Sequence, residues 1–187
     1  MDPCSRCHID PKLDTKRFIL YSVWFDIIWG CAVIGQDNWQ WLTWLLVVVS
    51  WVIVSWRCRQ EPYPVLLFMV SIAAIGITVD WLNSEFGLLS FSSSGIPYWL
   101  VALWCGFSWY LLCLTSLGAK WSFTIWVLFG ALGGASSYFG GARLGAVILP
   151  LGTLESIAIL AIEWACLFVG VRLWWYRWSS RYIVASL

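Results

Sequence analysis

Five charged side chains lie inside or beside long apolar stretches of this sequence. Asp26 and Glu163 lie near the middle of two such stretches. Asp80 lies near the end of a third, and Glu155 begins the stretch that contains Glu163. Arg143 lies in a run that is rich in glycine. Ionisable side chains inside a membrane are costly and mark candidate functional sites, so these residues are the first candidates for chemistry.

One predicted polar site lies near a membrane surface and consists of Asp80, Tyr138, Arg143 and Glu155. A guanidinium group binds a carboxylate or a phosphate through two parallel hydrogen bonds. The partner of Arg143 is therefore either an acid, with Asp80 preferred over Glu155, or an anionic lipid head group. Glu155 has a second interpretation, because the helix dipole favours an acid in the first turn after a cap such as Thr153.

Asp26 and Glu163 are predicted to lie near the middle of the membrane. Glu163 is about 13 Å below the outer end of its segment at 1.5 Å per residue, and Asp26 has a similar depth. The sequence contains no basic residue at this depth, so we expect at least one of the two acids to be protonated. Two interpretations remain open: a hydrogen bond across the bundle, or a proton relay or polar substrate contact.

The glycine-rich run also predicts a surface for helix packing. Small residues recur there at helical spacing and form one stripe, which would let transmembrane helices approach closely. Residues 140–152 are either a continuation of this helix or a re-entrant loop that begins at Gly140 and Gly141. The predicted stripe consists of Gly130, Gly134, Ser137, Gly141 and Gly145.

The amino-terminal tail contains Cys4, Cys7 and His8 at the spacing of a haem c attachment motif. Haem c is attached outside the cytoplasm, and we predict this tail to be cytoplasmic. His8 is the only histidine, and the sequence has no glycine-rich phosphate loop and no nucleophile elbow. We therefore predict no metal and no cofactor.

The elements that must position these side chains are membrane-spanning. Of the 187 residues, 61% are hydrophobic and 11% are charged, whereas soluble domains carry about 25% charged residues. No basic patch suggests nucleic acid. We predict an all-α polytopic membrane helix bundle of about six transmembrane helices (18–178), flanked by cytoplasmic tails (1–17 and 179–187). The apolar segments are 18–35, 39–56, 65–82, 97–117, 121–140 and 154–176, each about long enough to span a bilayer.

The basic residues predict the orientation. With the amino terminus inside, ten of the 11 Lys and Arg residues fall on the cytoplasmic side, and only Arg143 falls outside. We therefore expect a bacterial inner-membrane protein with both termini in the cytoplasm. Many of the 17 Trp residues are placed to anchor segment ends at the interface: Trp39, Trp41, Trp56, Trp81, Trp99, Trp121, Trp174, Trp175 and Trp178.

Three stretches together resemble an uncharacterised family of small bacterial inner-membrane proteins, a domain of unknown function. They are 76–82 with 87–91, then 97–104, and then the Gly-Gly-x-x-Ser-Tyr-x-x-Gly-Ala-Arg-Leu-Gly-Ala run at 133–146. The resemblance covers about residues 18–176 and implies a setting beside fatty-acyl-modifying enzymes. An Asn-His pair of the family's fourth helix is replaced here by Leu112 and Cys113.

We expect a lipid-associated membrane protein with an outward-facing polar site, acting in lipid modification, as an accessory subunit or in lipid handling. One alternative is a small proton-coupled transporter that uses Asp26 and Glu163. Another is a structural subunit of a membrane complex. The expected partners are membrane lipids, and another membrane protein or a second copy of the chain. No motif in the sequence decides whether the protein is an enzyme.

Overall fold

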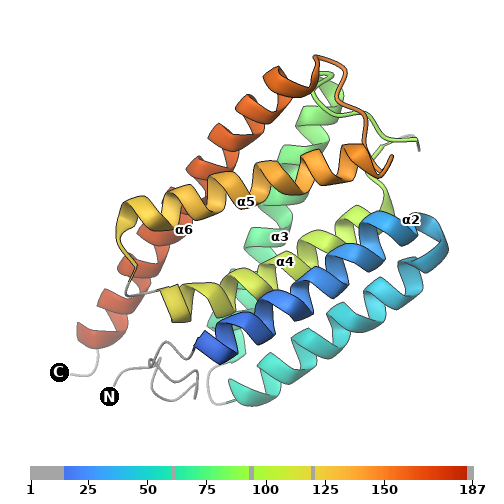
Figure 1. Cartoon of the computed structure of the whole chain (residues 1–187). Helices are drawn as coiled ribbons and strands as arrows, with labels where there is room; N and C mark the ends of the chain where they lie inside the picture. The colour runs from blue at the N-terminus through green and yellow to red at the C-terminus, as the bar shows by residue number, and fades with distance from the viewer. Residues whose placement is uncertain (1–14, 60–61, 93–94, 119–120, 185–187) are drawn as a thin grey trace.

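The computed structural model describes residues 15–59, 62–92, 95–118 and 121–184, and its regular structure there is helical. The motif of Cys4, Cys7 and His8 lies outside the described residues. All five helices are long and apolar enough to cross a membrane, which confirms the prediction of an all-α bundle compatible with a multi-pass membrane protein. They are α2 (Thr15–Arg57), α3 (Pro62–Glu85), α4 (Tyr98–Leu117), α5 (Phe123–Arg143) and α6 (Thr153–Val184) (Figure 1).

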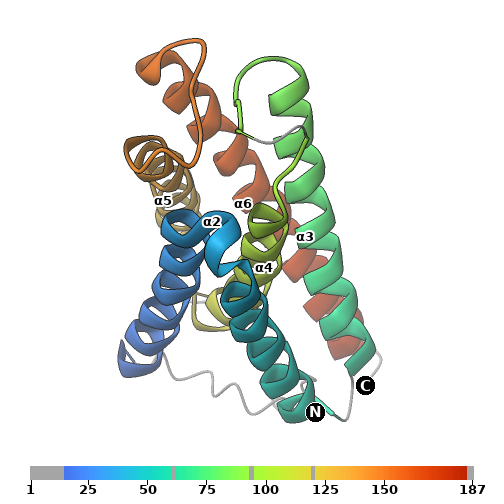
Figure 2. The ribbon, with the colours of Figure 1, turned by 90° about the vertical axis from the view of Figure 1, so that its right-hand side faces the viewer.

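The predicted number of about six helices is not exact, because the first two predicted segments form one continuous element, α2, whose two helical arms meet at a kink. Gln36 has φ 42° and ψ −128°, and α2 bends back on itself at this residue (Figure 2). The two arms of α2 lie antiparallel, since Trp24 Nε1 donates to Ser50 Oγ at 2.9 Å and Arg57 Nη1 donates to Tyr21 OH at 3.3 Å.

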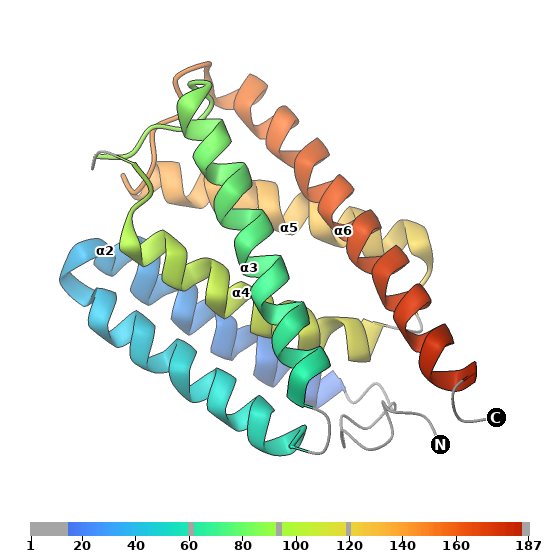
Figure 3. The ribbon, with the colours of Figure 1, turned by 180° about the vertical axis from the view of Figure 1, so that it is seen from behind.

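The ends of the helices gather at two opposite ends of the bundle. The beginning of α2 and the later part of α6 lie at one end, which we call the terminal end. The bend of α2, the end of α3 and the beginning of α6 lie at the other end (Figures 2 and 3). Helix α6 continues to Val184, past residue 178, where we predicted the transmembrane domain to end.

The helices pack in two units. Helix α4 packs against α2 and α3, whereas α5 packs mainly against α6. Most of α4 is buried, while each of the other four helices buries less than half of its apolar span. The first unit is therefore built around α4, and the α5–α6 pair lies against it.

Aromatic rings fill the space between the two units, and we call them the aromatic layer. Trp104 of α4 stacks on Trp164 of α6, with ring centroids 5.5 Å apart and an interplanar angle of 13°. Gly76 of α3 lies against the Trp104 indole, and Gly134 of α5 lies against the Trp164 indole, so that a Cβ atom at either glycine would overlap a ring. Stacked pairs of this kind contribute about 0.5–1.5 kcal/mol beyond the burial of their area.

The small-residue stripe therefore packs differently from the expected contact of helix backbones. Gly130 lies against the ring of Phe168, as Gly134 lies against Trp164, and Ser137 accepts a hydrogen bond from Trp29 Nε1 at 2.7 Å. Gly145 lies beyond the end of α5, with φ +74°, and so it is not part of the helical stripe.

Helix α5 passes through Gly140 and Gly141 without a break and ends at Arg143. A re-entrant loop beginning at Gly140 is therefore wrong. The following irregular segment pairs with the segment after α3: Ser90 and Ile148 exchange two backbone hydrogen bonds of 3.0 and 2.8 Å. Around this bridge, Leu88, Leu89 and Val147 pack with Leu160 of α6. The two connections thus close the end of the bundle opposite the terminal end.

A buried arginine ties α6 to the connection between α4 and α5. Arg172 donates from Nη1 to the Gly118 carbonyl at 3.1 Å and from Nη2 to the Trp121 carbonyl at 3.0 Å. Its guanidinium lies 5.6 Å from the ring of Trp126 and 5.0 Å from that of Tyr176. Arg172 is one of the ten basic residues predicted to lie on the cytoplasmic side, and the structure buries it as an internal anchor.

Candidate functional site

The candidate site is centred on the carboxyl group of Asp80, which is only 1% exposed. Its Oδ2 atom accepts a hydrogen bond from Trp104 Nε1 at 2.6 Å, and its Oδ1 atom accepts one from Tyr138 OH at 2.5 Å. The three side chains come from α3, α4 and α5. This buried acid therefore links both units of the bundle.

The local sequence explains why Trp104 reaches Asp80. Gly76 and Asp80 are four residues apart on α3 and so lie on the same face of the helix. Because Gly76 has no side chain, the indole ring of Trp104 lies directly against α3. The indole nitrogen then lies one helical turn further along, beside the carboxyl group.

A second hydrogen bond joins α3 to α6. Asn83 follows Asp80 by three residues on the same face of α3, and its Nδ2 atom donates to Glu163 Oε2 at 2.8 Å. Asn83 is buried and Glu163 is half-buried. Within the part of the chain that the structure describes, this is the one hydrogen bond of the Glu163 side chain.

A groove of about 690 Å³ lies along these residues between α3 and α6. Its polar side chains are Asp80, Asn83, Tyr138 and Glu163, and the described lining contains no basic side chain. The two helices lie on the same face of the molecule (Figure 3). The rest of the lining is apolar or small: Ile72, Ile75, Gly76, Val79, Leu82, Phe86, Trp104, Trp164, Cys166, Leu167, Gly170, Val171 and Trp174.

The groove is open at the outer surface of the bundle. On α3, Ile75 and Leu82 are 46% and 38% exposed, and on α6 the lining residues Cys166 and Gly170 are exposed. The polar side chains of the groove lie toward the carboxyl end of α3. Ile72 on α3 and Trp174 on α6 extend the groove toward the terminal end. The groove is therefore polar at one end and apolar along most of its length.

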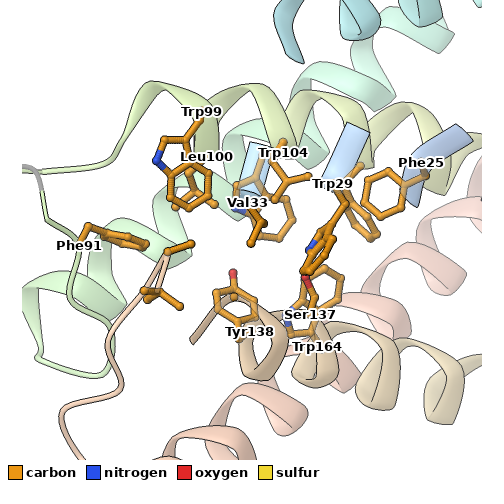
Figure 4. A pocket seen from close by; sticks show the side chains of 15 residues that line it. Phe25, Trp29, Val33, Phe91, Trp99, Leu100, Trp104, Ser137, Tyr138 and Trp164 are labelled. Carbon is orange, nitrogen blue, oxygen red and sulfur yellow. The ribbon is translucent and has the colours of Figure 1, made fainter. Parts of the chain in front are cut away.

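Tyr138 and Trp104 separate this groove from a smaller space of about 50 Å³ on their other side. Figure 4 shows the side chain of Tyr138 beneath Trp104, with Trp29 and Ser137 on one side and Phe91 on the other. The described lining of this space is almost wholly apolar. Asp80 lines only the larger groove, whereas its two hydrogen-bond donors, Trp104 and Tyr138, line both spaces.

The sequence model of one protein family, described as a protein of unknown function (DUF2878), matches residues 18–170. The chain belongs to the DUF2878 family. This finding confirms the predicted membership of a domain of unknown function over nearly the predicted range. No curated protein and no solved structure matches the chain. All four polar residues of the groove lie within the DUF2878 region, whereas Val171 and Trp174 lie just beyond it.

In this DUF2878 protein, two of the four predicted polar-site residues are in contact, namely Asp80 and Tyr138. Arg143 is exposed at the end of α5, and no ion pair of Arg143 occurs within the described segments. The predicted pair of Arg143 with Asp80 is wrong, because both oxygens of Asp80 are occupied by other donors in a buried position. Glu155 is exposed in the first turn of α6, as its second interpretation expected.

The two acids that were predicted to lie near the middle of the membrane are not brought together in the DUF2878 protein. Glu163 lines the α3–α6 groove and accepts a hydrogen bond from Asn83, whereas Asp26 is exposed and lines a different cavity beside α5. Trp164 lines both spaces and separates them. A direct relay between the two acids therefore has no support in this geometry.

The sequence interpretation of the DUF2878 site missed Trp104, Trp164 and Glu163 as neighbours of Asp80. One signal could have found the aromatic pair: Gly76 and Gly134 lie in the middle of helices, where a glycine often faces a large side chain. Glu163 was assigned a separate role by its depth. Depth along a helix does not show which neighbour the side chain faces.

Proposed function

We propose that this protein binds a membrane lipid in the α3–α6 groove. The apolar part of the groove holds a hydrocarbon chain, and the polar end receives the head group beside Asn83 and Glu163. The observation that carries this proposal is the distribution of polarity in a laterally open groove of about 690 Å³. Pockets of ligand size combine a mainly apolar lining with a few polar groups that fix the orientation.

The charge distribution supports an orientation for the bound lipid. Lys16, Arg17, Arg57 and Arg177 lie toward the terminal end of the bundle, and Arg143 lies at the opposite end. By the positive-inside rule this distribution favours a terminal end that faces the cytoplasm, in keeping with the predicted plasma-membrane protein whose termini are both cytoplasmic. The polar end of the groove then lies in the outer leaflet.

The polar residues of the groove select among head groups. The described residues that line the groove offer carboxyl, amide and phenol groups and no cation, so a free phosphate or carboxylate would find no counter-charge there. The Oε1 atom of Glu163 remains available to a hydrogen-bond donor, since the described hydrogen bond uses Oε2. The groove therefore favours a lipid whose head group presents a hydroxyl or an amine.

Filling the groove tests this proposal. Gly170 lines the groove, and a Cβ atom there would meet no atom within 4 Å. Gly170→Leu is therefore expected to fold and to occupy the space of the hydrocarbon chain. The measurement is the amount of lipid retained by the purified protein in mild detergent, quantified by native mass spectrometry.

Gly30→Leu is the matched control, because Gly30 is also a helical glycine with open space around it and lies outside the groove. We expect about tenfold less retained lipid in Gly170→Leu than in the wild type, and no change in Gly30→Leu. Equal retention of lipid in all three proteins would refute binding in the groove.

A further inference from the structure

A second cavity, of about 350 Å³, lies on the opposite side of the aromatic layer, between the first arm of α2 and α5. Aromatic side chains from α2, α4, α5 and α6 form most of its lining. It shares Trp164 with the α3–α6 groove, but its acidic residue is Asp26 and not Glu163. The two spaces therefore differ in both the walls and the carboxyl group that they offer.

Asp26 lies at the mouth of this cavity. Its side chain is exposed, and within the described segments it has no hydrogen bond and no ion pair. It is ten residues from the bend at Gln36, or about 15 Å along the helix, and so lies near the middle of the membrane. No basic side chain belongs to the described lining. An acid at this depth needs a partner that the described part of the chain does not supply.

The side of the cavity mouth that α5 forms, opposite Asp26, is open. Gly133 and Ser136 of α5 are exposed there, and a Cβ atom at Gly133 would meet no atom within 4 Å. A ligand can therefore pass between α2 and α5 to reach the carboxyl group of Asp26 without displacing a side chain at Gly133.

The wall behind Asp26 is a continuous cluster of rings. Phe25 stacks on Tyr110 with centroids 4.8 Å apart and an interplanar angle of 4°, and it meets Phe107 edge to face at 5.8 Å. Phe107 meets Trp164 edge to face at 4.9 Å. The hydroxyl of Tyr110 bonds with Ser22 Oγ at 2.9 Å. Aromatic faces attract cations, and a desolvated cation gains most from them.

We propose that this cavity binds a lipophilic organic cation, such as a quaternary ammonium or phosphonium ion, with Asp26 as its counter-charge. A neutral apolar ligand would leave the carboxyl group uncompensated, and an anion would be repelled by it. A metal ion does not fit, because the described residues contain no group of three metal ligands. The site is separate from the lipid groove and does not rest on the proposed function.

Tetraphenylphosphonium and tetraphenylborate have nearly the same shape and opposite charge, which makes them a matched pair of probes. Equilibrium dialysis of radiolabelled tetraphenylphosphonium against the full-length protein in detergent gives the affinity, with the borate as competitor. We expect saturable binding of the cation, no competition by the borate, and an affinity about tenfold or more lower in Asp26→Asn. Asp37→Asn is the control, since Asp37 is an exposed acid of the same helix outside the cavity.

A second variant separates a loss of binding from an effect of Asp26→Asn on folding. Gly133→Leu places a side chain in the open mouth and is expected to weaken binding of the cation while the thermal stability is retained. Unchanged binding in either Asp26→Asn or Gly133→Leu would overturn the proposal. Competition by the borate would also overturn it, and so would a loss of binding in Glu163→Gln but not in Asp26→Asn, which would place the cation in the other groove.

Discussion

Asp80 and Asp26 are both acids within long apolar helices, yet their surroundings are opposite. Asp80 is 1% exposed, and both of its carboxyl oxygens accept hydrogen bonds from neighbouring helices. Asp26 is exposed on the side of the bundle and has no such partner within the described segments. The first acid holds the bundle together, and the second is available to something outside it. The role of an acid in a membrane helix is therefore inferred from the groups that contact it and not from its depth.

The aromatic layer keeps the environments of the two acids separate, and disrupting it is expected to have the largest effect. In Gly134→Leu the Cβ atom alone would overlap the indole of Trp164. We expect a loss of about 3 kcal/mol or a failure to fold, since overpacking typically costs about 1–3 kcal/mol and more where backbone and ring cannot move. Thermal unfolding in detergent is the measurement.

Leu132→Ala on the same helix is the control. Leu132 is 65% exposed, so this variant should change the free energy of unfolding by less than about 0.5 kcal/mol. Similar melting temperatures for the two variants would contradict this packing.

Removing each acid in turn tests the comparison directly. Asp80→Ala leaves the indole N–H of Trp104 and the hydroxyl of Tyr138 without acceptors. Hydrogen bonds between membrane helices contribute about 0.6 kcal/mol on average and at most about 1.7, so we expect a loss of about 2 kcal/mol from the two bonds and the space left behind. Asp26→Ala should change stability by less than about 0.5 kcal/mol. Equal losses in chemical unfolding experiments would remove the distinction between the acids.

A smaller effect is expected from one hydroxyl group. Tyr138→Phe removes the donor to Asp80 Oδ1 and keeps the ring, so a loss of about 1 kcal/mol is expected. Tyr21→Phe is the control, because its hydroxyl accepts a longer bond of 3.3 Å from Arg57 at an exposed position. Tyr21→Phe should lie within about 0.5 kcal/mol of the wild type. The comparison fails if Tyr21→Phe proves the more damaging of the two changes.

The smallest effect is expected at Arg143. Because it is exposed and Asp80 has other partners, Arg143→Met should cost no more than about 0.5 kcal/mol. The double variant with Asp80→Asn should equal the sum of the two single changes. A coupling above about 1 kcal/mol in this double-mutant cycle would restore the ion pair and contradict the environment that the structure gives to Asp80.

The helical bundle and most helix boundaries were predictable, because a bilayer fixes the length and polarity of each segment. The break between the predicted segments 18–35 and 39–56 was also expected, but not that the single residue Gln36 would suffice to reverse α2. Trp99 was predicted to be interfacial and is buried, whereas Trp41 and Trp56 are 67% and 70% exposed. The partners of Asp80 could not be predicted. They depend on which helices pack together, and periodicity within one helix carries no information about its neighbours.

The bend of α2 has a consequence for how the chain enters the membrane. One residue, Gln36, with backbone angles outside the helical range joins the two arms, so there is no loop that could be translocated separately. The two arms together are about 64 Å of helix at 1.5 Å per residue, enough to cross a bilayer twice. Inserting one arm alone would leave the reversal and the start of the second arm stranded at the far surface. We therefore expect the two arms to enter a bilayer together as one helical hairpin, with polar Asp37 and Asn38 at its tip.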